Sequence, residues 1–253
     1  MPRGARVTVR RREFDAAIFD LDGVLTETAR LHAAAWKVLF DAFLRSWADR
    51  YGKPFRAFDD VADYLAYVDG RSRDDGIRCF LRSRGISLPE GAEQRSSAAD
   101  SVRALSDRKA RLFRERLEEG IEPFPGAEEL LQKLRQASIK TAVASSSKNC
   151  ALILRASGLD QLIDATADGL DVERLGLPGK PDPALFMEAT RRVGVQPHRA
   201  ILFEDALAGV EGGRRGGLGC VVGVDRGAQA EALLERGADI VIESLLDVGV
   251  ENS

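Results

Sequence analysis

The chain has 253 residues, of which 44% are hydrophobic and 30% are charged, and its formal net charge at pH 7 is -3. This composition is typical of a globular protein that buries a sizeable core in one large domain or two modest ones. The slight negative charge excludes a general attraction to nucleic acid or to an anionic membrane, and no apolar run approaches the roughly 18 residues of a membrane-spanning helix.

The amino terminus and the cysteines bear on the cellular compartment in which the protein is expected. No apolar segment follows the first arginines, so no signal peptide is recognised. Cys79, Cys150 and Cys220 lie far apart and match neither a disulfide framework nor a zinc site. We therefore expect reduced thiols and a cytoplasmic protein. Residues 1–13 contain five arginines and are predicted to form a flexible basic arm, with contact to phosphates as the alternative.

The first predicted core strand ends in two carboxylates. Residues 16–19 form a short apolar run of the kind found in strands buried on both faces. Asp20 and Asp22 follow, and Gly23 indicates a turn. A continuing strand would point both acids to one face, where they would repel each other. We therefore place them on a loop at the carboxyl end of the strand, where open α/β sheets bind ligands. An acidic turn without function is the alternative for this pair alone.

A helical segment follows this loop. Apolar residues recur every four positions over 29–50, and helical patterns also cover 59–67, 73–84 and 98–119. Nothing between 29 and about 118 reads convincingly as a strand. The sequence therefore predicts a helical cap domain at 29–118, inserted after the first strand of an α/β core.

Strands and helices alternate in the rest of the chain. Strands are predicted at 141–144, 162–165, 200–203, 220–224 and 239–242, and helices at 127–137, 148–157, 183–193, after 205, and at 228–236. A loop is predicted over 169–183. Such alternation is typical of a parallel sheet with helices on both faces. The predicted fold class is α/β, a doubly wound parallel sheet core with an inserted helical cap domain, and the core comprises 14–28 and 119–253.

Polar residues follow several of the predicted core strands. In chain order they are Asp20 and Asp22, Ser145 and Ser146, Lys180, and Glu204 and Asp205. Because the carboxyl ends of parallel strands share one edge of a sheet, we expect these side chains to meet there. Each has a simpler interpretation alone, since the serines can cap a helix, the lysine can be a solvated loop residue and the acids can open a helix. These interpretations do not explain why all of them fall at one edge.

A cluster of this composition has a definite chemistry. Grouped carboxylates repel one another unless a cation neutralises them, and oxygen ligands select a hard ion such as Mg2+. A hydroxyl and an ammonium group beside Mg2+ make a receptor for a phosphate dianion. One aspartate could then attack phosphorus, and the other could carry the proton of the leaving or entering hydroxyl.

These residues lie in four segments of the sequence. The segments are DLDGVLTET at 20–28, VASSSKN at 143–149, GKPDP at 179–183 and FEDALAGVEGG at 203–213. In order and spacing they resemble the four motifs of the haloacid dehalogenase-like superfamily, and the helical segment is similar to the cap of its beta-phosphoglucomutase-like branch. The resemblance covers both core segments, from about 14 to 28 and from 120 to 243.

The resemblance implies roles for the acidic residues. Asp20 would be the nucleophile that forms an aspartyl-phosphate, and Asp22 would be the general acid and base. Mg2+ would be held by Asp20, the main-chain carbonyl of Asp22 and Asp205, with Glu204 close by. An acid at Asp22 is usually lacking in dehalogenases and phosphonate-cleaving members, so its presence favours phosphate esters.

The resemblance also implies where phosphate binds. Ser145, Ser146 and Lys180 would hold the phosphoryl group, and Asn149 would lie near the site. In the linker and the cap, the branch carries residues that Thr28, His32, Gly70 and Arg73 match, as further catalytic or substrate-binding groups. For His32 the alternative is a structural histidine in a helical interface, and for Arg73 a solvated helix start.

The cap also departs from the branch at one position. Asp69 stands where the branch has a lysine, and an acid there would repel a second phosphate. We therefore expect a Mg2+-dependent phosphotransferase acting on a sugar phosphate, beta-phosphoglucomutase-like, with a sugar-phosphate phosphatase as the alternative. A non-catalytic binding protein on this fold is the second alternative. The expected partner is a phosphorylated sugar, without nucleic acid or membrane, and the expected state is a monomer.

Overall fold

The computed structural model describes residues 5–68, 73–91, 100–118, 120–227 and 229–252. It separates into two compact units, of which one comprises Met1–Thr28 and Ile121–Ser253 and the other Ala29–Gly120. These units are called the core and the helical insert below. The insert was predicted at 29–118, and the two units divide after Thr28 and after Gly120.

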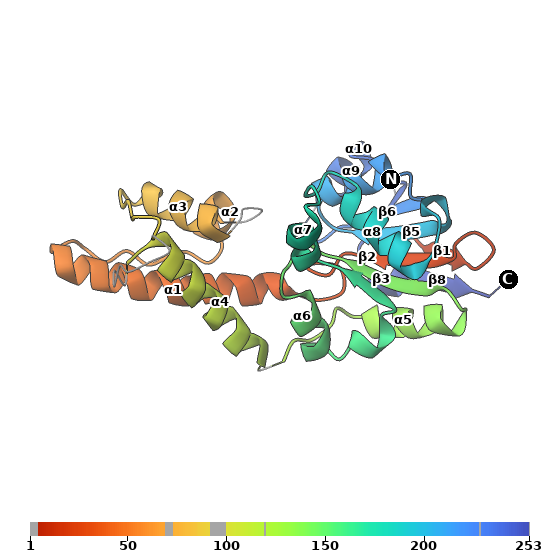
Figure 1. Ribbon diagram of the computed structural model, residues 1–253, viewed down its shortest axis with the longest axis horizontal. Helices are drawn as coiled ribbons and strands as arrows, with labels where there is room; N and C mark the ends of the chain where they lie inside the picture. Colours follow the sequence, from red (N-terminus) through yellow and green to blue (C-terminus); the bar gives the residue numbers. More distant parts are fainter. Residues whose placement is uncertain (1–4, 69–72, 92–99, 119, 228, 253) are drawn as a thin grey trace. The chain divides into compact units, whose positions relative to one another are not determined.

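A six-stranded parallel sheet forms the centre of the core (Figure 1). Its strands are β2 Ala16–Phe19, β3 Lys140–Ala144, β4 Ala165–Ala167, β5 Ala200–Glu204, β6 Cys220–Val224 and β7 Ile240–Ile242. They are arranged in the order β4-β3-β2-β5-β6-β7, and every neighbouring pair is parallel. The predicted α/β fold class is confirmed.

Helices cover both faces of this sheet. They are α5 Ala127–Gln136, α6 Cys150–Ala156, α7 Gly169–Leu175, α8 Ala184–Val193, α9 Leu207–Arg215 and α10 Ala230–Glu235. Figure 1 shows α5 and α6 on one face and α8, α9 and α10 on the other. Successive residues of a strand point to opposite faces. Accordingly Ile18 and Leu202 belong to one hydrophobic cluster with Phe186 of α8, while the rings of Phe19 and Phe203 stack on each other at 4.9 Å.

The amino-terminal segment differs from the predicted flexible arm where the structure describes it. Val7–Arg10 form β1, which pairs in parallel with β8, Val248–Glu251, in a separate two-stranded sheet. The side chains of Val7 and Val9 are buried. The alternation of valine with polar residues is a strand signal, which the high arginine content of this segment concealed. Strand β8 was not predicted either.

Strand β4, the third strand of the core sheet in chain order, lies later in the chain than predicted. Asp160–Leu162 form a 3-10 turn, and β4 begins at Ala165, so the predicted strand at 162–165 is wrong in all but its last residue. The apolar pair Leu162 and Ile163 suggested a strand. In the structure the Leu162 carbonyl accepts a hydrogen bond from the Thr141 hydroxyl at 2.7 Å, and the pair connects the turn to the sheet.

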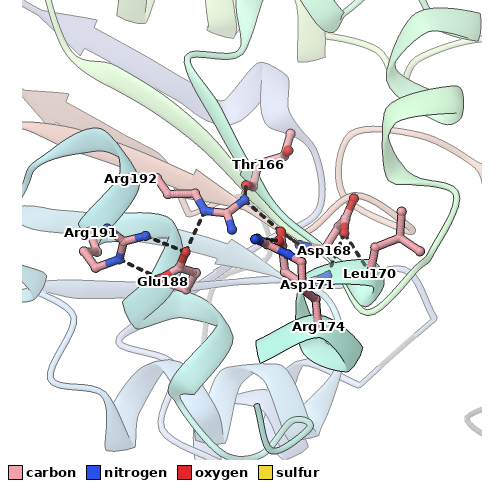
Figure 2. Close-up of polar contacts among 8 residues, drawn as sticks. All are labelled: Thr166, Asp168, Leu170, Asp171, Arg174, Glu188, Arg191 and Arg192. Atoms are coloured by element: carbon pink, nitrogen blue, oxygen red, sulfur yellow. Dashed lines mark hydrogen bonds and ion pairs between the residues drawn. The ribbon is translucent and has the colours of Figure 1, made fainter. Parts of the chain in front are cut away.

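Helix α7 lies in the segment that was predicted to be a loop. Asp168 caps it, because its carboxylate accepts hydrogen bonds from the amides of Leu170 at 2.9 Å and Asp171 at 3.2 Å. The Asp171 carboxylate in turn accepts one from the Asp168 amide at 3.1 Å, which completes a capping box. Figure 2 shows that Arg192 of α8 contacts Asp171 and the carbonyl of Thr166. This network fastens α7 to β4 and α8.

The helical insert contains no strand among its described residues. Its helices are α1 Thr28–Tyr51, which begins at the last residue of the core segment, α2 Ala62–Tyr67, α3 Arg73–Ser83 and α4 Val102–Glu118. Aromatic side chains form its centre, with Phe40 tilted against Phe58 at 5.1 Å and against Phe80 at 4.2 Å. Predicted site residue Gly70 lies outside the described residues. None of the helices in the described part of the chain is both long and apolar enough to span a bilayer.

Candidate active site

The strand order brings the predicted site residues of the core to one edge of the sheet. Phe19 of β2 pairs with Val143 of β3 on one side and with Phe203 of β5 on the other. Asp20 follows at this edge, and its amide donates a hydrogen bond to the Phe203 carbonyl at 2.9 Å. The chain leaves β2 toward β3 and leaves β5 toward β6, in opposite directions. Such a switch point is where open α/β sheets bind ligands.

Lys180 connects two carboxylates at this edge. Its Nζ donates hydrogen bonds to Oδ1 of Asp20 at 2.5 Å and to Oε2 of Glu204 at 2.7 Å. All three side chains are nearly buried. Burial disfavours the ammonium charge, but the charges of Asp20 and Glu204 and their hydrogen bonds outweigh it and raise the pKa of Lys180. The lysine is therefore charged at neutral pH and orients both carboxylates.

Asp20, Glu204 and Asp205 form a group that could hold a metal ion. One carboxylate oxygen from each lies within 4.8 Å of the others. Burial, reinforced by the charges of Glu204 and Asp20, raises the pKa of Asp205. Burial also raises the pKa of Glu204, against the opposing charge of Lys180. A divalent cation would stabilise the charged forms, and a set of hard oxygen donors fits Mg2+.

The Asp22 side chain is not part of this acidic group. Its carboxylate accepts a hydrogen bond from the Thr28 hydroxyl, and its backbone forms an isolated bridge with Thr26. The predicted pair Asp20 and Asp22 is therefore divided, with one member in the carboxylate group and the other in the turn that leads to α1.

Two glycines allow the acidic side chains to pack at the edge. Gly23 has a φ of +92°, and a Cβ on it would lie 1.9 Å from Oδ2 of Asp205. A Cβ on Gly209 of α9 would lie 2.1 Å from Oε2 of Glu204. Any larger residue would displace a carboxylate. From the sequence, Gly23 was predicted only as a turn residue and Gly209 was not singled out, although it lies one helical turn after the acidic pair.

The serine loop lies after β3 at the same edge. Ser145 is buried and its Oγ accepts a hydrogen bond from the Ser147 amide at 3.1 Å. Ser146 is exposed, and Asn149 precedes α6 without capping it through its side chain. A Cβ on Gly169 of α7 would lie 2.4 Å from the Ser146 carbonyl. Helix α7 therefore packs directly against the backbone of this loop. The phosphate-binding role of the loop remains a prediction.

The predicted histidine and arginine lie within the helical insert. Nδ1 of His32 is 2.6 Å from Nζ of Lys109, and its ring stacks on Phe113 at 4.2 Å. Burial, with smaller contributions from the charges of Lys109 and Arg73, lowers the pKa of His32 well below 6.5. The imidazole is therefore neutral at pH 7, and Nδ1 accepts the hydrogen bond from the lysine. Burial likewise lowers the pKa of Arg73, at the start of α3.

Lys109 itself was missed by the sequence analysis. It is buried in α4, where its Nζ lies 4.8 Å from the ring centroid of Phe113 and 5.1 Å from that of Trp36. Its position gives a signal in the sequence, because Leu105 and Phe113 lie one helical turn before and after it and both are core residues. A lysine on that apolar face is expected to be buried.

Known proteins resemble this chain over most of its length. A family model for the haloacid dehalogenase-like hydrolases matches residues 14–217. The beta-phosphoglucomutase of Mycobacterium tuberculosis (strain CDC 1551 / Oshkosh) is 43% identical over 237 residues, which cover 92% of this chain and 90% of the relative. The phosphorylated carbohydrates phosphatase of Thermotoga maritima is 30% identical over 239 residues, which cover 92% of this chain and 97% of the relative.

A solved structure shares the fold. The crystal structure of a beta-phosphoglucomutase from Clostridium difficile has a TM-score of 0.66 with this chain at 26% identity, and the match covers 92% of each chain. The resemblance that the four motifs indicated, including the beta-phosphoglucomutase-like branch, is confirmed.

Proposed function

The chain belongs to the haloacid dehalogenase-like hydrolase family, and we propose that it is a Mg2+-dependent phosphotransferase for a sugar phosphate that works through an aspartyl-phosphate on Asp20. The observation that supports this most strongly is the contact of Lys180 with both Asp20 and Glu204, beside Asp205, at the switch point of the sheet. A buried ammonium group among three carboxylates fits a site for a metal and a phosphate.

In the proposed reaction, Asp20 and Asp22 have different tasks. A carboxylate oxygen of Asp20 forms a bond to phosphorus while the bond from phosphorus to the substrate oxygen breaks. Asp22 gives its proton to that leaving oxygen, and in the second half takes a proton from the hydroxyl that attacks the aspartyl-phosphate. Thr28 orients Asp22 for this transfer, and Lys180 orients Asp20.

The other residues at this edge of the sheet would bind the metal ion and the phosphoryl group. Asp20, Asp205 and the Asp22 carbonyl would hold Mg2+, with Glu204 close by, and the ion would neutralise phosphate oxygens when bound. Lys180, with the hydroxyls of the serine loop, would hold the phosphoryl group through charge-assisted hydrogen bonds.

The first candidate for the acceptor is a sugar hydroxyl, which makes the protein a mutase. The 43% identical relative is named a beta-phosphoglucomutase, and Thr28, His32 and Arg73 match that branch. The helical insert would then favour a sugar hydroxyl over water as the acceptor.

Water as the acceptor, which makes the protein a phosphatase, is the second candidate. Asp69 stands where the branch has a lysine, and another relative is named a phosphorylated carbohydrates phosphatase. A non-catalytic protein on this fold is disfavoured because Asp20, Asp22, Lys180 and Asp205 are all present.

One assay separates the two acceptors. The protein is incubated with beta-glucose 1-phosphate, Mg2+ and a trace of beta-glucose 1,6-bisphosphate, and glucose 6-phosphate and inorganic phosphate are measured together. We expect glucose 6-phosphate to exceed inorganic phosphate. Release of inorganic phosphate without glucose 6-phosphate would rule out the mutase and support the phosphatase.

We also propose a cytoplasmic monomer. All three cysteines are free thiols, which supports a reducing compartment. Cell fractionation tests the location, and light scattering on the purified protein tests the oligomeric state.

A further inference from the structure

One arginine outside the four motifs contacts the turn that follows the two catalytic aspartates. Arg226 lies just after β6. Its Nε donates a hydrogen bond to the Gly23 carbonyl at 2.7 Å, and its Nη2 donates one to the Val24 carbonyl at 3.3 Å. A third, from Nη1 to the Glu243 carbonyl at 3.3 Å, fastens the same group to the loop after β7. Three main-chain carbonyls from two distant segments therefore share one guanidinium group.

The same guanidinium contacts the segment by which the chain re-enters the core. Its central carbon lies 3.7 Å from the ring centroid of Phe124, a close cation–π contact. The Phe124 amide donates a hydrogen bond to the Leu25 carbonyl at 2.9 Å, and Thr26 forms an isolated bridge with Pro123. Arg226 thus contacts both the outgoing turn and the returning segment, which are also bonded to each other.

The turn that this arginine holds is packed against the carboxylate group. Gly23 leaves no room for a Cβ beside Asp205, and its amide donates a hydrogen bond to the Thr26 carbonyl at 2.9 Å. Asp22 pairs with Thr26 in an isolated bridge, and its carboxylate accepts the hydrogen bond from Thr28. A shift of this turn would therefore move the Asp22 carboxylate relative to the carboxylates of Asp20, Glu204 and Asp205.

We propose that Arg226 is a positioning residue for proton transfer: by holding the carbonyls of Gly23 and Val24 it sets the orientation of Asp22. This inference rests on the proposed function, in which Asp22 is the general acid and base. The guanidinium group of Arg226 bonds three separate carbonyls through three nitrogens in one plane while its face lies on the Phe124 ring, whereas an ammonium group has only one nitrogen and lacks this planar spread of donors. The lysine variant therefore keeps the positive charge and loses the positioning.

The kinetic test compares two leaving groups. First-turnover rates are measured for Arg226→Ala and Arg226→Lys with beta-glucose 1-phosphate, whose sugar oxygen needs a proton to leave, and with p-nitrophenyl phosphate, whose product is a stable anion. Both variants should slow the sugar phosphate about tenfold or more and p-nitrophenyl phosphate less than about threefold. The matched control is Arg236→Ala, which removes an exposed arginine that pairs with Glu211 at 2.8 Å and should change neither rate.

Two kinetic outcomes would overturn the inference. Equal losses on both substrates would mean that Arg226 has only a structural role, and unchanged rates on both would mean that Asp22 is positioned without it. Asp22→Asn provides the reference, because it should show the same preference for the activated leaving group.

A measurement that needs no activity tests the contact itself. In Arg226→Ala, hydrogen exchange at the amides of Gly23 and Phe124 should become about tenfold faster. Exchange at the Asp20 amide, which is bonded to β5, should stay unchanged. Unchanged exchange at Gly23 and Phe124 would overturn the inference. If the wild-type protein turned over neither substrate, the proposed function would be wrong, and the exchange result alone would decide whether Arg226 holds the turn.

Discussion

At the scale of the residue, the candidate active site depends on a few side chains whose contacts no other residue can make. Lys180 faces two nearly buried carboxylates, so Lys180→Met would leave Asp20 and Glu204 without their shared cation. We expect unfolding in urea to show a loss of roughly 3 kcal/mol of stability, together with loss of turnover. Lys133→Met, which removes an exposed ion pair on α5, is the matched control and should be near neutral. A Lys180→Met protein as stable and active as the control would contradict the assigned contacts.

Gly23 gives a second prediction at this scale. Gly23→Ala places a methyl group 1.9 Å from Oδ2 of Asp205 in a backbone with φ of +92°, and should reduce both thermal stability and turnover. Gly217→Ala is the control, because Gly217 has φ of +66° and no atom lies within 4 Å of the position that its Cβ would take. It should cost only the backbone strain of about 1 kcal/mol. Equal effects of the two substitutions on turnover would show that the contact with Asp205 is unimportant.

Single residues also show what the sequence could predict of the site. Asp20, Lys180 and Glu204 were expected to meet because the parallel-strand rule places all carboxyl ends on one edge, and the contacts exist. Gly209 and Arg226 were missed, since their importance lies in the space beside another side chain and in hydrogen bonds to distant carbonyls. Arg226 leaves no pattern in a single sequence, and the signal for Gly209 is only its place one helical turn after the acidic pair.

At the scale of the element, the strands of the sheet were predictable because they are buried apolar runs, as in β2 and β5. Elements held by specific polar contacts were not. Helix α7 depends on the capping box of Asp168 and on Arg192 from another helix, and β1 depends on a partner strand 241 positions away in the chain. Their stability comes from tertiary contacts that local propensity does not include.

The connection between β1 and β2 gives a pH prediction at this scale. Hydrogen bonds from Arg199, and with smaller weight from Arg11, lower the pKa of Asp15 to about 2. The folded-state pKa of Asp15 lies below its unfolded value of 3.8. The stability that the charged Asp15 adds to the folded state is therefore complete above about pH 4 and is lost as the pH falls toward 2. Asp15→Asn should therefore lower the melting temperature at pH 6, and the difference from wild type should shrink below pH 4. A difference that stays constant down to pH 2 would contradict the ion pairs. Asp49→Asn, on an exposed position of α1, is the control.

At the scale of the whole molecule, the core alone contains the carboxylate group, the lysine, the serine loop and the turn that carries Asp22. The helical insert contains its own polar contact, between the half-buried His32 and the buried Lys109. This division assigns the chemistry of phosphorus to the core and makes the insert the proposed determinant of the acceptor. It also explains why the motifs predict the reaction class more sharply than the choice between a sugar hydroxyl and water.

The most direct test of the account is the turnover of beta-glucose 1-phosphate by Asp20→Asn in the presence of Mg2+, with Asp49→Asn as the matched substitution. Removing the nucleophilic oxygen should lower turnover on the order of 10³-fold or more, while Asp49→Asn should retain the wild-type rate. Full turnover by Asp20→Asn would contradict an aspartyl-phosphate at this residue.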